Sequence, residues 1–227
     1  MQNVAYSRIY GDFAGSKPAP ISATSQPSAD PLEMIGASMS FKRNAEIYGE
    51  NEPAEYFYKV VSGTVRTYRI LADGRRQIAA FYLAGDMFGL ETGENHASSA
   101  EAVCDVKVLL IKRSAIVAMA ARDSEIARQL WTLTARELHR AQEHVMALVK
   151  SAEERVAGFL LEMASRVPTG NQVELSMSRQ DIADYLGLTI ETVSRTMSHL
   201  ESTAMIELPS SRRVVLRNRT ALRRLNE

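Results

Sequence analysis

Between residues 36 and 122 the chain is a series of short β-rich segments separated by turn residues. Short β-rich runs end at turn signals such as Ser62–Gly63, and they cover residues 57–61, 65–71, 78–83 and 103–111. Short strands at such regular spacing are typical of an antiparallel roll or barrel. The pattern therefore predicts a β-roll domain over residues 36–122.

Between residues 123 and 150 the apolar spacing becomes helical, and this span has neither proline nor glycine. An uninterrupted helix here would be roughly 40 Å long and carries two apolar stripes, which favours a dimerisation helix between two domains. We assign the dimer interface to the stripe that continues into polar positions, namely Ile126, Leu130, Leu133, Glu137, Arg140 and His144. The second stripe holds Leu138, Ala141, Val145, Leu148 and Val149. The alternative is a helix that packs along its own β domain.

Residues 178–201 predict two short helices joined by a tight turn. Ser178 is a favourable N-cap for the first helix, Gly187 ends it, and Thr189 caps the second. Val193, Met197 and Leu200 recur at helical spacing on the second helix. This is the layout of a helix-turn-helix, in which the start of the second helix reads base edges in the major groove. A helix–glycine–helix corner without a DNA role is the alternative.

The residues that follow predict a wing. Two β-rich runs, 205–208 and 212–216, flank a Pro/Ser turn, which is typical of a hairpin. Arg212 and Arg213 lie near its tip, and the segment from Arg212 onward has six arginines and one acid, Glu227. Such a local positive charge neutralises phosphates. Residues 151–227 are therefore predicted to form a winged helix-turn-helix domain.

Composition restricts the alternatives. The chain has 227 residues, enough for two domains, and its 27 basic and 27 acidic residues argue against an indiscriminate polycation. Its one cysteine, Cys104, excludes an internal disulfide. Since no apolar run approaches roughly 20 residues and no signal peptide is present, we expect a cytoplasmic protein without a membrane partner. The Ser/Pro/Ala-rich residues 15–30 favour a mobile N-terminal arm over residues 1–35.

Three local sequences resemble the CRP/FNR superfamily of bacterial transcription regulators: GDMFG at 85–89, AEERVAGFL at 152–160, and SRQDIADYLGLTIETVSR at 178–195. The last is close to the FixK branch, and the resemblance extends from residue 38 to the C-terminus. It implies an α+β fold with an N-terminal antiparallel β-roll of the cyclic-nucleotide-binding jelly-roll type, a dimerisation helix and a C-terminal winged helix-turn-helix. It also implies a homodimeric activator on a TTGAT-N4-ATCAA-like palindrome, contact with RNA polymerase, and a role in microaerobic or nitrogen-fixation gene control.

The E-x-x-S-R reading motif of this family falls on Glu191, Ser194 and Arg195, to which the resemblance assigns base reading. Glu191 and Arg195 are four residues apart, on one helix face, where an ion pair between them is the alternative role. A carboxylate accepts from cytosine N4, and a guanidinium binds guanine O6 and N7. We assign supporting DNA contacts to residues that flank this motif: Ser178, Arg179, Thr189, Ile190, Thr192, Arg212 and Arg213.

Ligand use divides the superfamily. Cyclic-nucleotide binders resembling this chain have a glutamate directly after the FG pair, but here Leu90 follows it, and residues 96–100 lack the phosphate-binding arginine. FNR holds an iron–sulfur cluster on four cysteines, whereas this chain has Cys104 alone. We therefore expect no cyclic nucleotide, no iron–sulfur cluster and no other cofactor or metal. The alternative is a member gated by a small effector or by haem.

Enzyme function is not expected, because the chain lacks G-x-S-x-G, P-loop and H-E-x-x-H motifs. A module that uses the helix corner for protein contacts is a further alternative. Its binding would not show the steep salt dependence of DNA binding.

Overall fold

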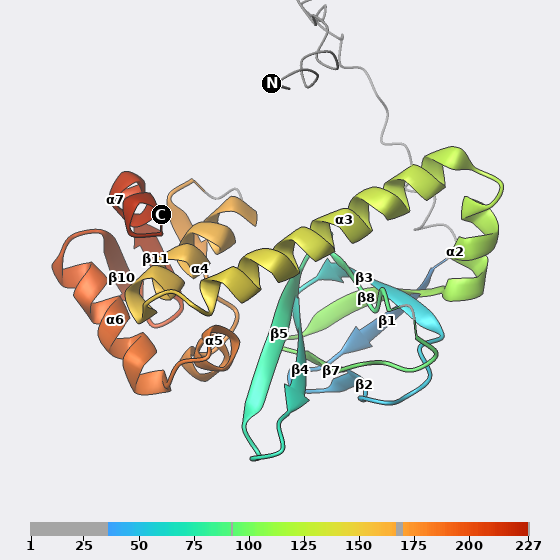
Figure 1. The fold of residues 1–227 in the computed structure, drawn as a ribbon, viewed down its shortest axis with the longest axis horizontal. Coiled ribbons are helices and arrows are strands. Elements are labelled where there is room, and N and C mark those ends of the chain that lie inside the picture. The colour runs from blue at the N-terminus through green and yellow to red at the C-terminus, as the bar shows by residue number, and fades with distance from the viewer. Residues whose placement is uncertain (1–35, 92, 167–169, 227) are drawn as a thin grey trace, which may run out of the picture. The chain divides into compact units, whose positions relative to one another are not determined.

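The N-terminal part of the described chain is a β-roll (Figure 1). The computed structural model describes residues 36–91, 93–166 and 170–226, all within the unit Pro31–Glu227. The predicted arm over residues 1–35 therefore lies outside the described residues. The strands of the roll are β1 (Ala37–Phe41), β2 (Glu46–Tyr48), β3 (Tyr56–Ser62), β4 (Thr64–Ile70), β5 (Arg76–Leu83), β6 (Met87–Phe88), β7 (Ser99–Ala102) and β8 (Val106–Lys112). They form two four-stranded sheets with strand orders β1-β8-β3-β6 and β2-β7-β4-β5.

Alternating apolar residues of both sheets meet in the core of the roll. Val60, Val65 and Val108 are fully buried there, each on a different strand. Gly63 makes the turn between β3 and β4 with a φ of +87°, and a Cβ at this position would lie 2.5 Å from the carbonyl oxygen of Asp105. The sequence predicted β3, β4 and β5 within two residues at each end. The strand predicted over residues 103–111 was wrong at its start, because β8 begins only at Val106.

Two helices follow the roll. Helix α2 (Arg113–Ala120), which the sequence analysis did not predict, is followed by the long α3 (Ser124–Ala147). The side chain of Asp123 caps α3 by accepting a hydrogen bond from the Glu125 N–H at 2.8 Å. Within the described ranges, no helix is long and apolar enough to cross a membrane.

The C-terminal part is a helical domain with a small sheet. Its elements are α4 (Ala152–Arg166), β9 (Gln172–Glu174), α5 (Arg179–Leu186), α6 (Ile190–Ser202), β10 (Ile206–Ser210), β11 (Arg213–Leu216) and α7 (Arg219–Asn226). The sheet has the order β10-β11-β9, so the predicted wing hairpin gains a third strand. Its core includes Leu160 of α4, Ile182 of α5 and Leu200 of α6, all fully buried.

Within the single chain, the stripe of α3 that the sequence assigned to the dimer interface makes contacts with the chain itself. Ile126 is buried, and Leu130 and Leu133 pack against the cluster formed by Met87, Ile111 and Ile116. Further along, Arg140 forms ion pairs with Glu137 at 2.9 Å and with Asp86 at 3.0 Å. The His144 ring stacks on Tyr185 with centroids 4.1 Å apart. On this side α3 packs along the β-roll and the helix-turn-helix of its own chain, as in the alternative prediction of a helix that packs on its own domain.

A different face of α3 is left uncovered. We call it the outer stripe: Trp131, Leu138 and Val145 of α3 and Val149, two residues beyond its end, are 75%, 59%, 62% and 79% exposed. Single exposed apolar residues are common on protein surfaces, but a row of three large ones on one helix, followed by a fourth just past its end, is unusual.

Candidate DNA-binding site

Helix α5 begins with a complete capping box. The Ser178 hydroxyl accepts a hydrogen bond from the Asp181 N–H at 3.1 Å, and the Asp181 carboxylate accepts one from the Ser178 N–H at 3.0 Å. Two N–H groups that a helix start leaves without partners are thereby satisfied. The predicted cap at Ser178 is confirmed, although its role is structural within α5.

Gly187 makes the turn between α5 and α6. It adopts φ +63° and ψ +38°, and its N–H bonds the carbonyl of Ala183. A left-handed conformation at this point ends α5 and redirects the chain, so that α6 starts only three residues later. The relative orientation of the two helices therefore depends on a backbone conformation that residues with a Cβ rarely adopt.

Gly187→Ala is expected to lower the free energy of unfolding by about 1–2 kcal/mol, because an L-residue in the left-handed region carries that strain. Thermal denaturation of the purified variant measures the change. Gly187→Asn is the matched control, since asparagine tolerates this region better and should lose less stability. Equal losses in the two variants would show that the backbone conformation is not the cause.

Helix α6 presents a polar face at its start. The Thr189 side chain caps it by accepting from the Thr192 N–H at 3.2 Å. The inward positions Val193, Met197 and Leu200 are buried, as the spacing predicted. The predicted base-reading residues Glu191, Ser194 and Arg195 are all exposed, as is Ile190.

The electrostatics of this face suit a site that reads bases. The N–H of Glu191 itself and the Thr189 hydroxyl lower the pKa of the Glu191 carboxyl, and the charge of Arg195 adds to that effect. The residue is therefore an ionised acceptor at neutral pH. No salt bridge joins Glu191 to Arg195 in the part of the chain that the structure describes. The two charged side chains are therefore not paired with each other.

Arg179 lies in the first turn of α5. It is half-buried, and burial lowers the pKa of its guanidinium. Its Nη1 atom is buried and has no hydrogen-bond partner.

The wing carries the other predicted basic residues. Arg212 and Arg213 are exposed at the turn between β10 and β11, and the Arg213 N–H donates to the Ser210 hydroxyl at 3.2 Å. Two more arginines of this segment are engaged elsewhere, since Arg217 pairs with Glu207 and Arg219 donates to the carbonyl of Gly170. The free positive charge of the wing is thus concentrated at its tip.

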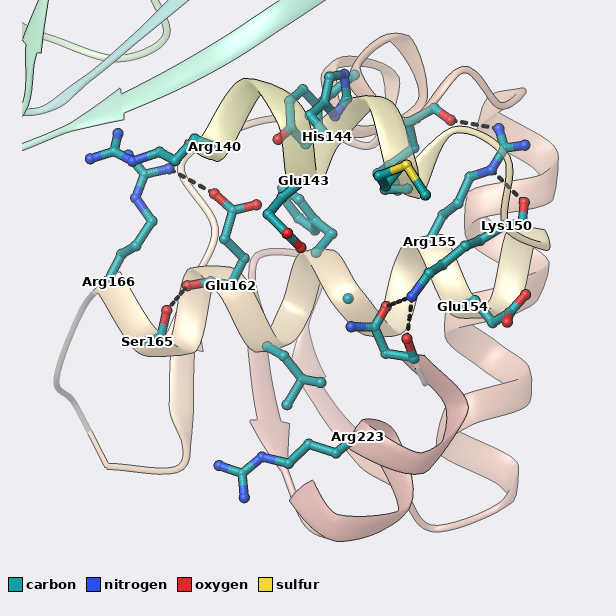
Figure 2. A pocket seen from close by; sticks show the side chains of 18 of the residues that line it. Arg140, Glu143, His144, Lys150, Glu154, Arg155, Glu162, Ser165, Arg166 and Arg223 are labelled. Atoms are coloured by element: carbon teal, nitrogen blue, oxygen red, sulfur yellow. Dashed lines mark hydrogen bonds and ion pairs between the residues drawn. The ribbon is translucent and has the colours of Figure 1, made fainter. Parts of the chain in front are cut away.

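Helix α4 supports the helix-turn-helix from behind, a role the sequence analysis missed. Figure 2 shows Arg155 and Lys150 reaching across a cleft of about 560 Å³ that α3, α4 and α7 line. Arg155 donates from Nη1 to the carbonyl of Leu186 at 2.9 Å, at the end of α5, and from Nε to the carbonyl of Lys150 at 2.8 Å. Lys150 in turn bonds Asn226 at the end of α7. Arg155 therefore provides a hydrogen-bond donor for the Leu186 carbonyl, next to the Gly187 turn that connects α5 to α6.

A second cavity, of about 290 Å³, lies beside the β-roll. Phe88, Glu91, Arg140 and Arg166 are among its lining residues. Both arginines already pair with Asp86, and Arg166 also pairs with Glu162 at 3.1 Å. Across the described residues, no group of three or more His, Cys, Asp or Glu side chains could hold a metal ion.

Comparisons with known proteins agree with this geometry. Residues 38–123 match the cyclic nucleotide-binding domain model, and residues 154–225 match the Crp-like helix-turn-helix domain model. The nitrogen fixation regulation protein FixK of Azorhizobium caulinodans is 53% identical over 208 residues, which cover 88% of this chain and 84% of the relative. The protein of the same name from Rhizobium meliloti is 40% identical over 198 residues, covering 86% and 90%.

A solved structure gives the same result. The structure of FixK2 from Bradyrhizobium japonicum aligns with a TM-score of 0.82 and 50% identity, covering 85% of this chain and 98% of that one. The α+β fold and the resemblance inferred from the sequence are therefore confirmed. With its β-roll, its helix-turn-helix and these relatives, the chain belongs to the CRP/FNR family and is a FixK-type transcription regulator with a DNA-binding domain.

Proposed function

We propose that this regulator binds, as a homodimer, an inverted repeat of the TTGAT-N4-ATCAA type and activates transcription there. The observation that carries the proposal is the face of Glu191, Ser194 and Arg195, exposed at the start of the capped helix α6. The guanidinium matches guanine O6 and N7, and the ionised carboxylate matches the amino group of cytosine. A mobility-shift titration tests it: the purified protein should retard the palindromic duplex and not one with both half-sites scrambled.

The outer stripe of α3 supports the homodimer. Trp131, Leu138 and Val145 recur every seven residues along α3, which is the interval at which a coiled-coil core position repeats. Two copies joined along this stripe would bury apolar side chains that the single chain leaves in water. A two-fold dimer presents two reading helices to successive major grooves, which an inverted repeat requires.

Several features support operation without an effector. The two cations of the β-roll cavity, Arg140 and Arg166, are neutralised by carboxylates of the same chain. A cyclic nucleotide would have to displace these pairs in order to gain a partner for its phosphate. Cys104 is half-buried and the chain has no second thiol, so it has no thiolate set for a cluster. We therefore propose a regulator free of cyclic nucleotide, iron–sulfur cluster and other cofactors.

The relatives suggest the setting. Three of them are named for nitrogen fixation regulation, and another is the transcriptional activatory protein AadR of Rhodopseudomonas palustris. We extend these names to a role in nitrogen-fixation or microaerobic gene control, with RNA polymerase as the protein partner. Transcription in vitro from a promoter that carries the palindrome, with and without the purified regulator, measures activation directly.

Arg212→Ala in the wing is expected to weaken binding to all DNA sequences about equally and to lower the salt slope by roughly one phosphate. The reason is that Arg212 is exposed at the wing tip, where it can neutralise a phosphate without reaching a base. Binding titrations at several salt concentrations measure the slope. Arg122→Ala, an exposed arginine before α3, is the control and should leave the slope unchanged. A changed sequence preference in Arg212→Ala would mean that the wing reads bases or groove shape.

The alternative of an effector- or haem-gated regulator rests on the β-roll cavity. Its volume of about 290 Å³ is at the lower limit of ordinary small-molecule sites. Thermal melts against a panel of nucleotides, metabolites and haem distinguish the two. An effector-gated protein would be stabilised by one of these compounds, whereas the proposed protein would be stabilised by operator DNA alone.

A further inference from the structure

A buried ionic cluster joins the β-roll to the first helix of the helix-turn-helix. Arg66 of β4 donates from Nη1 to Asp181 Oδ1 at 2.9 Å and from Nη2 to Glu101 Oε1 at 2.6 Å. Arg76 of β5 donates from Nη2 to the same Asp181 oxygen at 2.6 Å and from Nε to Asp184 Oδ2 at 2.8 Å. The Arg66 and Asp181 side chains are only 7% and 6% exposed, so water does not screen this contact.

Asp181 has two roles, one for each carboxylate oxygen. Its Oδ2 accepts from the Ser178 N–H at 3.0 Å and from the Ser178 hydroxyl at 2.9 Å, which completes the α5 capping box. Its Oδ1 accepts from Arg66 and Arg76. The carboxylate that starts α5 is therefore also the group that anchors α5 to the roll.

Neighbouring contacts fix the same orientation. The Gln77 amide donates to the carbonyl of Asp184 at 2.7 Å, beside the Arg76 pair. Beneath it, the Phe81 ring lies 5.2 Å from Tyr185, and Ile78 of β5 is fully buried in the core that includes α4, α5 and α6. Strand β5 thus contributes both apolar and ionic contacts to the DNA-binding domain.

We infer that Arg66 and Arg76 are positioning residues for DNA recognition. Buried ion pairs add little net stability compared with apolar contacts, but their directional bonds restrict geometry, and in this arrangement each of the five charged groups has an oppositely charged partner. Because α6 follows α5 after the short turn at Gly187, fixing α5 on the roll also fixes the direction of the reading face. This role rests on the proposed DNA binding, and it explains how α6 is oriented for that binding. The chain itself then holds its reading helix in a binding-competent orientation.

The test separates orientation from DNA binding. In a Cys104→Ser background, spin labels at Lys107 on the roll and Thr220 on α7, both exposed, report the distance between the two domains. Labelled subunits are diluted into excess unlabelled protein, so that distances within one subunit dominate. We expect one narrow distribution for the parent and a broad one for Arg76→Glu, which places a carboxylate against Asp181 and Asp184. If the competent orientation falls to about one tenth of the population in each subunit, the apparent Kd rises about tenfold for one half-site and about a hundredfold for the palindrome.

Charge exchange provides the rescue. In Arg76→Glu/Asp184→Arg the new arginine lies three residues after Asp181 on α5, within reach of both that carboxylate and Glu at position 76. The double variant should recover the narrow distribution and most of the affinity. Arg75→Glu is the matched control, because Arg75 is 77% exposed and pairs with Asp73 in its own hairpin. Its distance distribution should equal that of the parent.

A narrow, unchanged distribution in Arg76→Glu overturns the inference, whatever happens to DNA affinity. A broad distribution that the charge exchange does not narrow also overturns it, because the pairs would then not be the cause. If the parent fails to bind the palindrome, the proposed function fails, while the distance measurements still decide whether the cluster sets the orientation.

Discussion

Leu138→Asp is expected to yield folded monomers whose affinity for the palindrome is lower by several orders of magnitude, because two linked half-site contacts become one. Leu138 is 59% exposed in the single chain, and its neighbours on the outer stripe are Trp131 and Val145. A carboxylate at the centre of the stripe would be buried without a partner in the dimer and solvated in the monomer. Sedimentation velocity measures the oligomeric state, and circular dichroism measures the fold.

Two further variants on the same helix make this result specific to one face. Arg136→Asp introduces the same side chain two residues away, at an exposed position off the stripe, and should remain a dimer. Leu130→Asp should lower thermal stability instead, since Leu130 packs against Met87, Ile111 and Ile116 within its own chain. A dimeric Leu138→Asp protein would place the interface elsewhere.

Arg195→Ala is expected to cost about 1–3 kcal/mol at each half-site, the value of one bidentate contact to guanine, and therefore about twice that for the palindrome. Each half-site loses roughly 5- to 150-fold in affinity. The exposed position of Arg195 on the face of Glu191, without a salt bridge to it, is the basis of this expectation. Binding titrations against the palindrome and its single-base variants measure both affinity and preference.

The conservative change separates reading from simple charge. Arg195→Lys keeps the positive charge but loses the planar fork that binds two guanine acceptors at once. It should lose most of the discrimination at one base pair while keeping more of the sequence-independent affinity. If Arg195→Ala discriminates between the same single-base variants as the parent does, Arg195 does not read a base.

Local features of the DNA-binding domain could be predicted from the sequence because each depends on neighbouring residues. The cap at Ser178, the left-handed turn at Gly187 and the buried row beginning at Val193 follow from side-chain chemistry and helical spacing. Strands β3 to β5 could also be predicted, because each is a β-rich run bounded by turn residues. Shorter elements such as β6, β9 and the helix α2 lacked either a clear period or a flanking turn signal.

Long-range partners could not be predicted in the same way. In sequence, the stripe from Leu130 to His144 resembles a dimer interface because it mixes apolar and charged residues. In the structure, Arg140 of this stripe pairs with Asp86, and the His144 ring stacks on Tyr185 of the same chain. Arg66 and Asp181 are 115 residues apart in sequence and meet only after folding. Helical spacing identifies two stripes on α3, and only the tertiary structure shows which one remains exposed.

The most direct test of the central claim is selection from a random duplex library by the purified protein, prepared without nucleotide, metal or haem. We expect enrichment of two inverted half-sites of the TTGAT type, separated by four base pairs and bound by two subunits. Enrichment of no common sequence, of a single half-site, or of the palindrome only after a small molecule is added would contradict it.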